Sequence, residues 1–145
     1  MKKKLPLLAL TAIIVLSLIG CGQKLPAGFS ERLVTSQAQN VVNLANLKNY
    51  EKVVSELRED LQNQVTADAL RDSWEPVLSE SGGFVDFKKI SLDNTTDSAT
   101  GEKYAVVVLT CAYENANRTF TLSLDRNYDV AGLYLEKEKG FGILP

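Results

Sequence analysis

Hydrophobic residues recur every three or four positions through the first half of the chain, which is the spacing of helices that bury one face. The first predicted helix covers residues 31–45, and the hydroxyl of Ser30 is placed to cap its first turn. A second helix follows Asn49 and extends to Leu61, with charged residues on its opposite face. Both helices are therefore expected to pack one side against a common core.

A third helix is predicted after Thr66, which is placed to cap it. Pro76 lies inside this segment, lacks an amide donor and clashes one turn back, so a kink or an end is expected near Glu75. Gly82 and Gly83 then mark the end of the helical half of the chain.

From Phe84 onward the hydrophobic period changes from helical spacing to alternation, which is typical of β-strands. The alternation changes parity across Lys88 and Lys89, and this predicts a β-bulge in the first strand. The polar stretch 93–103 is predicted to be a loop. Three further strands are expected at residues 104–113, 120–124 and 130–135.

Helices first and strands second predict an α+β fold, with helices packed on one face of a curved, cone-like antiparallel sheet of about four strands. The folded domain is expected to cover residues 29–136. The strand positions predicted to face the helices are all apolar: Val107, Leu109, Cys111, Phe120, Leu122 and Leu124.

The N-terminus has the layout of a secretory signal. Lys2, Lys3 and Lys4 precede an apolar run over residues 5–18, which is too short to span a bilayer as a helix. The run ends in Leu-Ile-Gly-Cys, which resembles the bacterial lipobox, with cleavage between Gly20 and Cys21. An uncleaved anchor helix and an ordinary secretory signal are the alternatives.

The lipobox resemblance implies a signal peptide over residues 1–20 and acyl chains, including palmitate, on Cys21. Two or three acyl chains hold a protein firmly on a bilayer. The expected location is the extracytoplasmic face of a cell membrane, in the cell envelope. Residues 21–28 then form the lipidated cysteine and a short tether, and residues 137–145 form a C-terminal tail.

Charge and composition exclude several classes of function. Loss of the three signal lysines reduces 16 Lys and Arg to 13, against 18 Asp and Glu, which leaves a net charge of −5 and argues against nucleic acid as a partner. The chain has no histidine, so imidazole bases and histidine metal sites are excluded. Cys111 lies in an apolar strand and is expected to be a buried, inert thiol. No cofactor or metal is predicted, and Asp93, Asp97 and Glu102 lack calcium-loop spacing.

Several short stretches together resemble a known family. They are Phe29–Val34, Tyr50–Val54, Leu70–Trp74, Gly83-Phe84 and Val130–Leu133. Their order is similar to that in bacterial domain-of-unknown-function family 3887, whose members are often lipoproteins. The resemblance implies a fold similar to the nuclear-transport-factor-2-like cone over most of residues 29–136. It implies no catalytic residues.

Trp74, Tyr113 and Tyr134 are the candidates for a ligand pocket, although each is also typical of a core or rim position. We expect a non-enzymatic domain that binds an unknown protein or a small apolar ligand, with the membrane contacted through Cys21. The alternative is a small cone-fold enzyme, isomerase- or hydrolase-like, that uses a carboxylate and a tyrosine. The apolar inward positions predict that no such pair exists.

Overall fold

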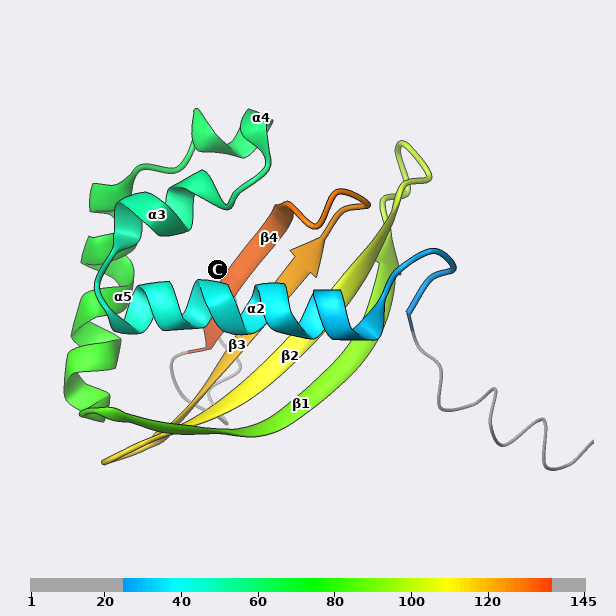
Figure 1. Ribbon diagram of the computed structural model, residues 1–145. Helices are drawn as coiled ribbons and strands as arrows, with labels where there is room; N and C mark the ends of the chain where they lie inside the picture. The colour runs from blue at the N-terminus through cyan, green and yellow to red at the C-terminus, as the bar shows by residue number, and fades with distance from the viewer. Residues whose placement is uncertain (1–24, 137–145) are drawn as a thin grey trace, which may run out of the picture.

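The computed structural model describes residues 25–136, so the predicted signal peptide over residues 1–20, the predicted lipidation site Cys21 and the predicted tail 137–145 lie outside the described residues. Helices come first and a four-stranded antiparallel sheet follows, as predicted (Figure 1). The elements are α2 Glu31–Asn46, α3 Tyr50–Ser55, α4 Glu59–Gln62, α5 Ala67–Ser81, β1 Phe84–Thr96, β2 Lys103–Tyr113, β3 Asn117–Leu124 and β4 Val130–Glu136.

Helix α2 forms as its sequence predicts. The Ser30 hydroxyl accepts a hydrogen bond from the Leu33 amide at 3.4 Å and caps the first turn. The buried stripe consists of Val34, Ala38, Val41, Val42 and Ala45. These side chains lie against the inner face of the sheet, so α2 crosses the sheet and fills its concave side (Figure 1).

The prediction of one continuous second helix is wrong, because the structure divides this segment into two helices, α3 and α4. Asn49 caps α3 by accepting from the Lys52 amide at 3.3 Å. The chain then leaves the helix at Leu57 and pairs with the start of β4: the Arg58 amide donates to the Val130 carbonyl at 2.8 Å, and the Val130 amide donates to the Glu56 carbonyl at 2.9 Å. These bonds to a distant strand replace helical bonds, so the helix is interrupted.

Of the two outcomes expected near Glu75, a kink or an end of the third helix, the end is wrong. The Thr66 hydroxyl caps α5 as predicted, accepting from the Ala69 amide at 3.0 Å, but the helix continues past Pro76 to Ser81. Beyond the proline, Val77 and Leu78 are buried. Their packing compensates for the single helical bond that proline removes.

The sheet is a meander in the order β1-β2-β3-β4. The register of β1 shifts between Phe87 and Lys89, which confirms the predicted bulge, and it shifts a second time between Phe84 and Asp86. The predicted loop over 93–103 is too long, because β1 continues to Thr96, which pairs with Lys103. Buried and exposed residues do not alternate clearly along β1, because β1 is an edge strand and much of its surface is exposed to water.

The core lies between α2 and the inner face of β2 and β3. All six positions predicted to face inward are 0% exposed: Val107, Leu109, Cys111, Phe120, Leu122 and Leu124. Burial raises the pKa of the Cys111 thiol to about 12, which fits an inert thiol. Within residues 25–136, no helix is long and apolar enough to cross a membrane.

Candidate functional site

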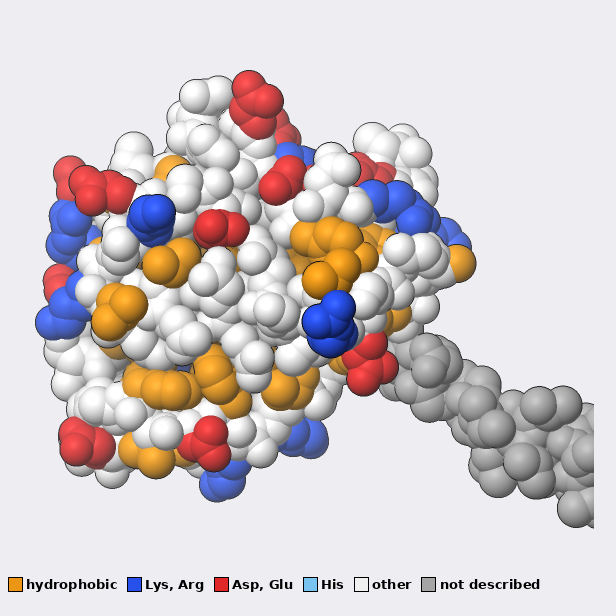
Figure 2. Space-filling model, in the orientation of Figure 1, with side chains coloured by type: hydrophobic (Ala, Val, Ile, Leu, Met, Phe, Trp, Pro, Cys, Tyr) orange, Lys and Arg blue, Asp and Glu red, His pale blue; other side chains and the backbone are white. Residues whose placement is uncertain are grey.

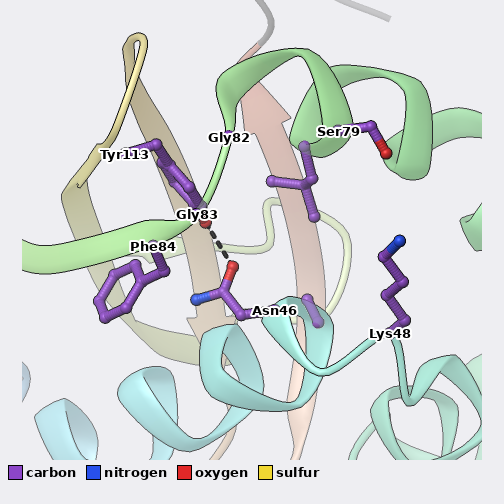
Figure 3. Close-up of a pocket in the computed structure, with 9 residues that line it drawn as sticks. Asn46, Lys48, Ser79, Gly82, Gly83, Phe84 and Tyr113 are labelled. Carbon is purple, nitrogen blue, oxygen red and sulfur yellow. Dashed lines mark hydrogen bonds between the residues drawn. The ribbon is translucent and has the colours of Figure 1, made fainter.

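A pocket of about 380 Å³ opens at the end of the molecule where α2 stops (Figure 3). It lies between the last turn of α2, the end of α5, the start of β1 and the end of β2. Its volume is within the range of small-ligand sites. The lining residues are Ala45, Asn46, Lys48, Leu78, Ser79, Gly82, Gly83, Phe84 and Tyr113.

The polar centre of the pocket is the pair Asn46 and Tyr113. The Tyr113 hydroxyl donates to Asn46 Oδ1 at 2.6 Å, which ties the end of α2 to the end of β2. Asn46 Nδ2 is buried and bonds to none of the described residues. In Figure 3 this nitrogen points toward the side of the pocket that Phe84 occupies. An unpaired buried amide is an energetic cost that a hydrogen-bond acceptor would remove.

The hydroxyl of Tyr50 is a second buried polar atom without a partner among the described residues. Tyr50 is the first residue of α3 and is 1% exposed. Burial raises the pKa of Tyr50 and of Tyr113 above the ordinary value for a phenol. Both hydroxyls therefore stay protonated at neutral pH and act as hydrogen-bond donors or acceptors, not as bases.

Lys48 places a positive charge at the pocket and pairs with Glu75 of α5. Lys48 Nζ lies 3.6 Å from Glu75 Oε1, and the lysine side chain is 60% exposed. Lys48 has φ of 60°, in the left-handed region that few residues other than glycine adopt readily. Its amide donates to the Ala45 carbonyl at 2.9 Å and closes the helix, so the amine stands beside the pocket mouth.

The opposite wall depends on Gly82 and Gly83. Gly82 has φ of 82°, and an added Cβ would lie 3.0 Å from Glu114 Cβ. Glu114 Oε1 accepts from the Gly83 amide at 2.8 Å. The side chain of Glu114 thus contacts both glycines and is hydrogen-bonded to one of them. None of the nine lining residues carries a carboxylate.

The structure places only one of the three candidate ligand residues in this pocket. Tyr113 lines it. Trp74 is 7% exposed and packs edge-on against Phe120, with ring centroids 5.5 Å apart, so it lies in the core. Tyr134 pairs with Thr121 between two inward-facing leucines of β4, so strand alternation places it on the outer face of the sheet.

Asn46 was missed by sequence reasoning, although the sequence carries a signal for it. Asn46 follows Val42 by four positions, so it continues the buried stripe of α2 with a polar residue. Such a residue needs a partner inside the protein. Lys48 and Phe84 carry no comparable signal, because their place at the pocket follows from how α2 meets the sheet.

The surface offers a second feature in a row of hydrophobic side chains below α2, along β1 (Figure 2). On β1, Val85 is 62% exposed and Ile90 is 39% exposed. Val85 lies at the register shift between Phe84 and Asp86 and is exposed, whereas Phe87 two positions later packs against the core. The described residues contain no cluster of three or more acidic or cysteine side chains placed to hold a metal ion.

Comparison with known proteins defines the family. The model of the family "Protein of unknown function (DUF3887)" matches residues 38–133, which is more than half of the chain. The protein therefore belongs to this family, as the sequence stretches above suggested. A comparison with curated proteins gives no match.

One solved structure is similar to this fold. It is the NMR structure of a protein from Ruminococcus gnavus ATCC 29149, which is 28% identical in sequence with a TM-score of 0.69. The match covers 77% of this chain and 95% of that one. Neither the family description nor the description of this structure names an activity.

Proposed function

We propose that this protein is a lipid-anchored, non-enzymatic binding domain on the extracytoplasmic face of a bacterial membrane, and that it binds a small ligand in the pocket at the end of α2. The observation that carries the binding role is Asn46 Nδ2, a buried donor with no partner among residues 25–136, on a residue that lines a cavity of about 380 Å³.

The pocket chemistry favours a ligand with an apolar body and a hydrogen-bond acceptor. Ala45, Leu78 and Phe84 provide apolar walls, and Asn46 provides the donor. A ligand oxygen that reached the Asn46 amide nitrogen would accept its unused hydrogen bond. An oxygen that carries negative charge would also be attracted by the Lys48 amine at the rim.

The absence of a carboxylate from the lining favours binding over catalysis. A cone-fold isomerase or hydrolase requires a carboxylate base beside a tyrosine, and here Tyr113 is protonated and bonded to an amide. The concave face of the sheet is filled by α2, so binding is assigned to the end of the core and not to its centre.

The membrane anchor rests on the sequence, where a short basic and apolar leader ends at Gly20-Cys21. The test is expression of the full chain in a bacterium fed with labelled palmitate. Label is expected in the wild-type chain and is expected to be absent from Cys21→Ser, with Cys111→Ser as the matched control that keeps the label. An unlabelled wild-type chain would exclude the anchor.

The binding role is tested by native mass spectrometry of the full chain released from membranes in a mild detergent. We expect an added small mass that disappears on denaturation and is missing from Asn46→Leu. The control is Gln39→Leu, which changes an amide on α2 outside the pocket. If the wild-type chain shows no added mass after incubation with an extract of the cell envelope, the proposal of a small ligand is wrong. A protein partner on the β1 surface is then the alternative.

A further inference from the structure

The chain segment that precedes α2 is fastened to the β3–β4 turn. Leu25 and Phe29 pack against the core. The Ser30 amide donates to the Tyr128 hydroxyl at 3.0 Å, across 98 positions of sequence. Arg126 Nη1 donates to the Ala27 carbonyl at 2.9 Å. The half of the predicted tether nearest the domain is therefore part of the folded structure.

Aromatic and cationic contacts reinforce this attachment. The rings of Phe29 and Tyr128 meet edge-on with centroids 5.9 Å apart, and the Arg126 guanidinium lies 5.3 Å from the centre of the Phe29 ring. Hydrogen bonds, an edge-on aromatic contact and a cation–π contact all involve the same few residues. The chain therefore enters the domain at a fixed point beside the β3–β4 turn.

The distances place the anchor and the pocket at opposite ends of the domain. Cys21 precedes Leu25 by four positions, which bounds its reach from the domain to about 14 Å. Helix α2 begins at this end, and its 16 residues extend about 24 Å. Asn46 is the last residue of α2, so the pocket lies a full helix length from the point of attachment.

Exposed charge of both signs lies at each end of the domain. The end where the chain enters exposes Arg32 and Arg126 together with Glu31 and Asp129, and the pocket end exposes Lys48 together with Glu80 and Glu114. The orientation therefore rests on the point of attachment alone.

We propose that the Cys21 anchor holds the domain with the β3–β4 turn toward the bilayer and the pocket opening away from it, so that the ligand of the pocket is a water-borne small molecule and not a membrane lipid. This inference rests on the lipid anchor in the proposed function.

The test uses energy transfer from tryptophan to dansyl-labelled lipid headgroups in vesicles that carry the acylated full chain. The chain has 1 Trp, Trp74, which lies on α5 one helical turn before the pocket residue Leu78. The matched variant is Trp74→Phe/Asn127→Trp, which moves the donor to the exposed β3–β4 turn. We expect several-fold greater transfer from position 127 than from Trp74.

Equal transfer from the two positions, or greater transfer from Trp74, would overturn the orientation. A chain that does not float with the vesicles would instead overturn the anchor. In that event Cys21 is coupled to a maleimide lipid, which spares Cys111 because that thiol is buried, and the same comparison decides the orientation. A phospholipid mass held by the wild-type chain and lost in Asn46→Leu would overturn the water-borne ligand.

Discussion

Two tyrosines hold the two ends of α2, and their surroundings differ. At the start of the helix, the Tyr128 hydroxyl accepts from the Ser30 amide, and its ring packs on Phe29. At the end of the helix, the Tyr113 hydroxyl donates to the Asn46 oxygen, and the nitrogen of that amide has no partner in the described part of the chain. The first end is closed by several contacts that support one another. The second end borders a cavity.

The difference between the two ends makes the Asn46 end the candidate functional site of this fold. An unpaired buried donor costs about 1–3 kcal/mol, and apolar residues of the same shape would avoid that cost. Packing alone does not require an asparagine at the end of a stripe of valines and alanines. A ligand that satisfies Asn46 gives a reason for it, and no similar reason is needed at the Tyr128 end.

The largest effect is expected in the core that joins the two ends. Phe120→Ala should lower the free energy of unfolding by about 3–5 kcal/mol, because Phe120 is 0% exposed and supports Trp74 across the core. Urea denaturation measures the loss. Thr121→Ala, on the outer face of the same strand, is the control and should change stability little. A loss below about 1 kcal/mol for Phe120→Ala would contradict this packing.

The pocket end should show strong coupling between its two polar residues. Tyr113→Phe leaves both groups of the Asn46 amide unpaired and should cost about 1–3 kcal/mol. Adding Asn46→Leu should restore most of the stability, because the buried polar group is then gone, while ligand binding stays lost. Denaturation of the two single variants and the double variant measures the coupling. Additive losses would show that the two side chains do not act as a pair.

The chain-entry end should be less sensitive. Tyr128→Phe removes the acceptor for the Ser30 amide but keeps the ring packing, so we expect a loss of about 1 kcal/mol. Water can reach this partly buried amide, which limits the cost. Hydrogen exchange at Ser30 should become faster in the variant. A loss greater than that of Tyr113→Phe would reverse the contrast between the two ends.

The smallest effect concerns pH and the buried thiol. The unfolded Cys111 thiol ionises near pH 9.0, whereas burial raises its pKa in the folded protein to about 12. The unfolded state therefore gains free energy as pH rises above 9, and stability falls. At pH 9.5 the wild-type chain should lose about 0.8 kcal/mol more than Cys111→Ala, each relative to its own stability at pH 7. Equal losses in both chains would show that the thiol is not the cause.

The sequence determined the element types and most of the core. The local signals are helical spacing, the caps at Ser30, Asn49 and Thr66, the β-rich run of β2 and the alternation in β3. Each formed the element that it predicts. Such signals suffice because a buried face has to repeat with the period of its own backbone. The six inward strand positions were read correctly for the same reason.

Tertiary structure decided what depends on distant partners. The break between α3 and α4 exists because the chain at Leu57 pairs with Val130, and α5 continues past Pro76 because the residues beyond it are buried. The pocket arises where the end of α2 meets the end of β2, and the two residues that join them, Asn46 and Tyr113, are 67 positions apart in the sequence. Local periodicity carries no information about such meetings, so the sequence alone indicated Tyr113 as a candidate but not Asn46 as its partner.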